Sequence, residues 1–138
     1  MKKFKKILSV IILICLIAMK SLVFAGGTDS YHGYISAVAE WDADLYITAN
    51  DDYAGASTTI YPVSPTNALY CQVDLYIIQR DPVTQQISAK DSHIVADYVA
   101  YGSTGLSTDF RCYIVSASTY HEAYCLGDID STNLSVGP

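Results

Sequence analysis

The sequence has few basic residues outside its first 25 positions. Eight of its 138 residues are Lys or Arg, and five of these precede Gly26. Arg80, Lys90 and Arg111 remain beside all 14 Asp and Glu residues, so residues 26–138 have a formal charge of 3 − 14 = −11. Such a surface repels nucleic acid and anionic lipid. We therefore expect no nucleic-acid partner, and no membrane binding by residues 26–138.

Residues typical of catalytic and zinc sites are also scarce. The chain has three histidines and four cysteines, with no CxxC pair and no Cys/His spacing of a zinc site. On a strand, His121 and Cys125 would share a face but lie roughly 13 Å apart, too far for a Cys–His dyad. We expect no catalytic residues, no cofactor and no enzymatic activity, which leaves a small wall hydrolase as the weakest functional hypothesis.

Three aspartate pairs offer the oxygen ligands that calcium prefers. Asp51 and Asp52 are the best candidates for calcium ligands because they lie in a predicted loop. Calcium needs six to eight oxygens, usually from several loops, and no EF-hand loop is present. The sequence therefore predicts no metal site, and the pairs read as solvated faces: Asp42/Asp44, Asp51/Asp52 and Asp128/Asp130.

The first 25 residues have the three parts of a secretory signal peptide. A lysine-rich start precedes the apolar run 7–19, and Val23 and Ala25 occupy the small-residue positions before a cut. The apolar run is shorter than the roughly 20 residues of a membrane span. We predict that residues 1–25 are removed after Ala25, that residues 26–138 form a single domain, and that the protein is secreted and extracellular.

Residues 69–90 have the clearest pattern of a β-hairpin. Apolar and polar side chains alternate over 71–77, and the residues 81–84 favour a turn because Asp and Pro occupy its first two positions. In this register Ile78 faces Ile87. Asp74 would face Asp91, an unfavourable pair that should end the pairing.

Shorter β-rich segments occur along the rest of the chain. We predict strands over 34–41 and 44–49, broken near Asp42, and over 57–61. The segment 93–101 favours a strand over a helix because of its β-branched content. Six to eight short strands at fairly even spacing predict an all-β fold, an antiparallel β-sandwich, with a small β-barrel as the alternative. Composition predicts loops or frayed ends elsewhere: 26–30, 50–55, 62–67, 102–107 and 131–138.

A second hairpin is predicted over 110–117 and 121–129, around a turn at 118–119. This register places Cys112 opposite Cys125, within reach of a disulfide bond. Cys71–Cys112 is the alternative pairing if those two strands are neighbours. Export permits disulfides, and the odd number of three cysteines after the leader leaves one thiol over or pairs it between chains.

All 12 tyrosines of the chain follow residue 25. Tyrosine has high strand propensity, which accounts for most of them. An exposed tyrosine also offers a large contact area with a polar tip, which suits protein or sugar binding. In the register above Tyr113 faces Tyr124, and with Tyr76 and Arg111 they form the predicted binding surface.

Three short motifs resemble those of small secreted immunoglobulin-like or fibronectin-type-III-like sandwich proteins of Gram-positive bacteria. They are Ile78-Gln79-Arg80 at the end of a middle strand, Phe110-Arg111 at the start of a late strand, and His121-Glu122 on the last hairpin. The likeness spans most of residues 26–138. It departs from the pattern in having Phe110 where Tyr is usual and in lacking a Trp after the first turn. The resemblance implies a sandwich fold and export, and no activity.

These observations favour a non-catalytic extracellular binding or surface-associated module. Its partner would be the cell wall, a glycan or an extracellular protein. The alternative is a secreted antibacterial or toxin-like effector.

Overall fold

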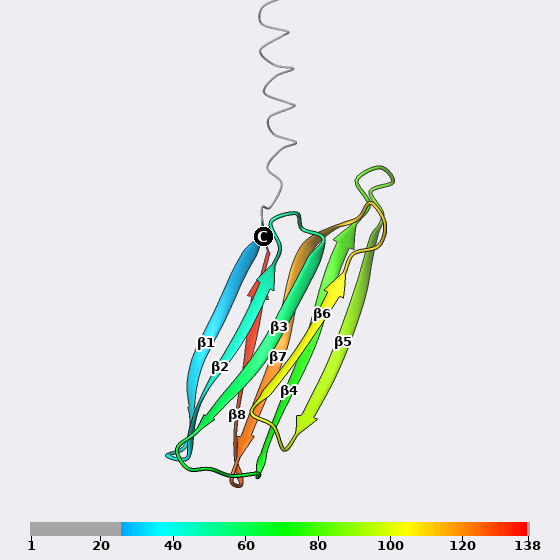
Figure 1. The fold of residues 1–138 in the computed structure, drawn as a ribbon. Helices are drawn as coiled ribbons and strands as arrows, with labels where there is room; N and C mark the ends of the chain where they lie inside the picture. Colours follow the sequence, from blue (N-terminus) through cyan, green and yellow to red (C-terminus); the bar gives the residue numbers. More distant parts are fainter. Residues whose placement is uncertain (1–25, 138) are drawn as a thin grey trace, which may run out of the picture.

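The computed structural model describes residues 26–137, which form eight β-strands in two antiparallel sheets (Figure 1). The sheets stack face to face without closing into a barrel. The predicted β-sandwich is confirmed and the barrel alternative is wrong. One sheet has the order β1-β2-β3-β6, formed by β1 (Gly27–Ile35), β2 (Ala39–Ile47), β3 (Tyr53–Pro62) and β6 (Tyr101–Ser107). The other has the order β5-β4-β7-β8, formed by β4 (Leu69–Arg80), β5 (Ile87–Asp97), β7 (Tyr113–Cys125) and β8 (Asp128–Val136).

The predicted signal peptide, residues 1–25, lies outside the described residues. Residues 26–137 contain no helix with the length and apolar character that a membrane crossing requires.

The connectivity begins with a three-stranded meander, β1-β2-β3. The chain then crosses to the β4-β5 hairpin, returns for β6, and crosses again to the β7-β8 hairpin. In immunoglobulin domains the third strand belongs to the opposite sheet from the first two. Here the third strand stays in the same sheet as the first two, so the strand order differs from that of an immunoglobulin domain.

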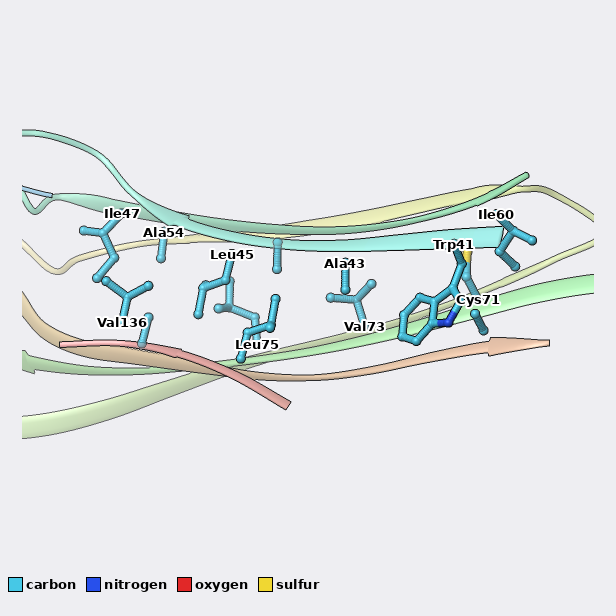
Figure 2. Close-up of a cluster of buried hydrophobic side chains, with 14 of the residues drawn as sticks. Trp41, Ala43, Leu45, Ile47, Ala54, Ile60, Cys71, Val73, Leu75 and Val136 are labelled. Carbon is cyan, nitrogen blue, oxygen red and sulfur yellow. The ribbon is translucent and has the colours of Figure 1, made fainter. Parts of the chain in front are cut away.

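The core lies between the two sheets. Successive side chains of a strand point to opposite faces, so every second residue of β2 and β4 enters it. Figure 2 shows side chains of β2 directed at those of β4 across this space. The side chains in this layer are at most 4% exposed: Trp41, Ala43, Leu45 and Ile47 from β2, and Cys71, Val73 and Leu75 from β4.

The first predicted hairpin forms with a turn two residues longer than expected. Arg80 pairs with Ile87, and within the predicted turn Asp81 Oδ1 accepts a hydrogen bond from the Thr84 amide at 3.1 Å. A shift of two residues keeps every side chain on its predicted face. It also replaces the unfavourable Asp74–Asp91 pair with Asp74–His93, and pairing continues to the end of β5.

The second predicted hairpin is wrong. Residues 113–125 form one uninterrupted strand, β7, and the chain reverses at Leu126 and Gly127, both with positive φ. A two-residue turn of this kind suits antiparallel strands because its twist matches theirs. The sequence interpretation missed it because leucine is seldom found at positive φ.

Both predicted disulfide pairings fail with this correction. Cys112 directly precedes the 13-residue strand β7 and Cys125 is its last residue, so the two lie about 40 Å apart at strand rise. Cys71 lies opposite Ala123, near the Cys125 end of β7, so it is also far from Cys112. The three cysteines that lie in residues 26–137 are free thiols.

Several strand boundaries also differ from the prediction. The first break falls at 36–38 and not at Asp42. The segments 26–30, 102–107 and 131–138, expected to be loops or frayed ends, contribute to β1, β6 and β8. The strand predicted over 93–101 is confirmed as far as Asp97. It then breaks at Tyr98, whose φ is positive.

Candidate functional site

The outer face of the β5-β4-β7-β8 sheet brings two adjacent rows of polar and aromatic side chains together. Each row crosses all four strands, because neighbouring residues in a row are paired directly across the sheet. At a strand spacing of about 4.8 Å, a row is roughly 14 Å long. The first row is His93–Asp74–Tyr120–Asn133, and the second is Asp91–Tyr76–Ser118–Ser135.

A hollow of about 480 Å³ lies over these two rows. Tyr76 and Tyr120 occupy diagonal positions on the neighbouring strands β4 and β7, close enough for both rings to contact one ligand. Ser118 and Ser135 are small and exposed, and they leave space beside the rings. We name this hollow the outer groove, and it is open to solvent along the sheet.

Asp74 is held in a fixed orientation in the outer groove. His93 Nδ1 is hydrogen-bonded to Asp74 Oδ1, and Gln72 Nε2 donates to Asp74 Oδ2 at 2.8 Å. Partial burial acts to raise the pKa of Asp74, but the hydrogen bonds from His93 and Gln72 outweigh it and hold this pKa below its ordinary value. At neutral pH the groove therefore contains an oriented carboxylate that accepts hydrogen bonds.

Tyr120 is fixed by a neighbour on its own strand. Its hydroxyl donates to Glu122 Oε2 at 2.6 Å. Tyr76 is the more open of the two rings, with 44% of its surface exposed. The groove thus combines one immobilised ring and one accessible ring with carboxylate, imidazole, amide and hydroxyl groups.

The structure places three of the four predicted binding residues on this face but does not gather them. Tyr76 lines the outer groove. Tyr113 lies toward one end of the sheet, opposite Arg80, and Tyr124 toward the other, opposite Tyr70. The predicted Tyr113–Tyr124 pair is wrong because both residues belong to β7. Arg111 lies before β7, with its guanidinium 5.0 Å from the centre of the Phe110 ring.

Sequence reasoning missed Tyr120, His93 and Asn133. A signal for Tyr120 was present: polar or aromatic residues at 118, 120, 122 and 124 alternate with smaller or core-facing ones, as in one long strand. Placing a turn at 118–119 hid that alternation.

The outer face of the first sheet holds a second tyrosine surface, which sequence reasoning also missed. Tyr46, Tyr53 and Tyr101 line a hollow of about 340 Å³ there. A Cβ at Gly55 would come within 2.5 Å of the Tyr46 ring, and one at Gly105 would overlap Tyr53. Glycine within a strand is a signal that another group approaches the backbone closely, and here that group is a tyrosine ring.

Other candidate residues have structural partners. His121 is fully buried between the sheets, with its ring nitrogens hydrogen-bonded to Thr58 Oγ1 at 2.8 Å and Thr119 Oγ1 at 2.7 Å. Asp130 accepts a hydrogen bond from Trp41 Nε1 at 2.8 Å, which connects β8 to β2. Among residues 26–137 no three His, Cys, Asp or Glu side chains are grouped as metal ligands.

Comparisons with protein-family models, curated proteins and solved structures found no match. The side chains of the outer groove themselves indicate what it can bind. Oriented carboxylate and amide oxygens beside aromatic rings bind ligands that have both hydroxyl groups and apolar C–H faces.

Proposed function

We propose that residues 26–138 form an extracellular, non-catalytic protein that binds a neutral glycan in the outer groove. The observation that supports it is the placement of Tyr76 and Tyr120 beside Asp74, with the small hydroxyl side chains of Ser118 and Ser135 next to the rings. A sugar ring has an apolar C–H face that packs on an aromatic ring and a rim of hydroxyls that donate to a carboxylate. The groove offers both kinds of contact at once.

Charge selects the class of glycan. Asp74 and Asp91 both line the groove, and residues 26–138 have a formal charge of −11. A polysaccharide bearing phosphate, sulfate or carboxylate groups would be repelled. A neutral polymer of the cell wall or of an extracellular matrix is the better fit. Its long axis would run parallel to the two rows, across the four strands.

A glycan suits this surface better than a folded protein partner. Stable protein interfaces bury about 800 Å² on each side around a hydrophobic centre that is depleted in charged residues, whereas Asp74, Asp91 and His93 line the outer groove. No feature of this face favours the alternative function, a secreted antibacterial or toxin-like effector.

The test is co-sedimentation of the chain Gly26–Pro138 with insoluble neutral polysaccharides, an anionic polysaccharide and isolated Gram-positive cell walls. We expect the protein to pellet with a neutral polymer and not with the anionic one. We expect no released sugar fragments in the supernatant, because a pKa held below its ordinary value makes Asp74 a hydrogen-bond acceptor and a poor general acid. Release of fragments would show an enzyme and contradict the proposal.

Matched variants locate the binding surface. Tyr76→Ala should weaken binding roughly tenfold, the effect expected when one stacked aromatic contact is lost. Tyr101→Ala is the control, because it makes the same change to an exposed tyrosine on the opposite sheet and should leave binding unchanged. If Tyr101→Ala abolishes pelleting and Tyr76→Ala does not, the site lies on the β1-β2-β3-β6 face instead.

A further inference from the structure

The carboxyl group of Asp51 is buried without a charged partner among the described residues. Asp51 lies in the loop between β2 and β3 and is 0% exposed. Its Oδ1 accepts one hydrogen bond, from the backbone nitrogen of Gly26 at 2.9 Å. Its Oδ2 is buried and has no hydrogen-bond partner within residues 26–137. The ion pairs found in residues 26–137 all use other carboxylates. A buried charge in this state is strongly unfavourable.

Backbone hydrogen bonds hold Asp51 in this position. Its amide donates to the Thr48 carbonyl at 2.9 Å, and its own carbonyl accepts from the Ile114 amide at 2.7 Å. Its φ is +55°, which is uncommon for a residue with a side chain. The loop is therefore anchored to β2 and to the start of β7, and the carboxyl group stays directed at Gly26.

Gly26 fits this place because it has no side chain. A Cβ at this position would lie 2.8 Å from the Ile47 carbonyl oxygen and 3.0 Å from that of Thr48. Both contacts are with backbone atoms that cannot move away. In the sequence Gly26 directly follows Ala25, the residue after which the signal peptide is predicted to be cut.

We propose that the α-amino group of Gly26, freed by removal of the leader, is the counter-ion of Asp51. A signal-peptidase-type protease hydrolyses the Ala25–Gly26 peptide bond with one water molecule. Ala25 keeps the new carboxylate, and Gly26 keeps the new amino group, which is protonated at neutral pH.

Hydrolysis of the Ala25–Gly26 bond changes the interaction between Gly26 and Asp51. An amide nitrogen offers one neutral N–H, whereas the ammonium group has a positive charge and three N–H donors. The ammonium group neutralises the buried carboxylate and supplies a donor for Oδ2 as well as Oδ1. The neutral hydrogen bond becomes a charge-assisted ion pair, and the fold gains its full stability only after the leader is removed.

The test compares chains that differ only at the amino terminus. Both described sheets and the core between them are built from residues 26–137, so a chain that begins at Gly26 contains all eight of these strands. One chain begins at Gly26, a second begins at Ala25, and a third is the Gly26 chain with its amino group acetylated. The Ala25 chain is a matched control, because it has the same net charge with the amino group moved by about 3.8 Å.

In urea unfolding, the folding equilibrium constant of the Gly26 chain should be roughly a hundredfold larger than that of the Ala25 chain or of the acetylated chain. An effect of this order is expected when a buried ion pair loses one partner. In the Asp51→Asn background the Gly26 and Ala25 chains should be equally stable. In the Asp52→Asn background, where a neighbouring exposed carboxylate is neutralised, the full difference should remain.

Equal stability of the three wild-type chains would overturn the proposal. A difference that persists unchanged in Asp51→Asn would also overturn it, because the amino group would then act on another partner. If Asp51→Asn does not fold, the three wild-type chains still decide the question, since none of them contains that substitution.

Discussion

His121 shows at the scale of a single residue how the two sheets are joined by polar groups. It belongs to β7 and bonds to Thr58 of β3, which lies in the opposite sheet. Burial lowers the pKa of His121 to about 4, and the nearby Asp74 carboxylate only partly opposes this. The ring is neutral in the folded protein at any pH well above that value.

We expect acid to destabilise the fold through His121. Between pH 6.5 and 4 the unfolded chain binds a proton at this residue that the folded chain does not bind, so stability falls as the pH falls through this window. The loss should approach about 3 kcal/mol at pH 4. Urea unfolding of the wild type and of His121→Gln at several pH values would measure it. Equal pH slopes in the two proteins would contradict this assignment.

At the scale of elements, the sequence predicted a hairpin correctly where the alternation of apolar and polar side chains and the turn-forming residues both indicated it. The 71–77 pattern and the Asp81 turn predicted the β4-β5 hairpin and its faces. They missed the length of the turn, because a shift of two residues leaves the hydrophobic pattern unchanged. The fold class followed from several such segments together.

The β7-β8 hairpin could not be predicted in the same way. Its turn contains leucine at positive φ, a conformation that residue preferences disfavour. The outer groove depends on this hairpin, because Tyr120 and Asn133 reach it only when β7 is unbroken and paired with β8. Tyr76 alone was found in advance, since its strand was identified correctly.

Because β7 is unbroken, the structure predicts that the three cysteines of the Gly26–Pro138 chain are not bridged to one another. In denaturant without reductant, the Gly26–Pro138 chain should show three free thiols by reaction with a disulfide reagent, because no pair of cysteines is bridged. In the folded protein only Cys112 should react, because Cys71 and Cys125 are fully buried and burial raises the pKa of Cys71 to about 11.

Reaction at Cys112 should be slow. Partial burial and the nearby Asp81 and Asp109 carboxylates raise its pKa, which lowers the thiolate fraction. Cys112→Ser should abolish the reaction in the folded state. A count of one thiol in denaturant would contradict the structure, because it would require a disulfide bond.

At the scale of the whole molecule, two polar faces enclose one apolar layer, and an excess of acidic residues surrounds both. We expect this negative charge to repel nucleic acid and anionic polymers, whereas neutral sugars carry no charge for it to act on. The two tyrosine surfaces lie on opposite sheets, so a ligand bound to one does not contact the other. This separation allows the proposed site to be located without ambiguity.

The most direct measurement is an NMR titration of isotope-labelled Gly26–Pro138 with a short soluble fragment of the neutral polymer that pellets the protein. The account predicts amide shift changes in the four strand segments that form the outer groove, around Tyr76, His93, Tyr120 and Asn133. Changes confined to β3 and β6, or no changes at saturating fragment, would contradict it.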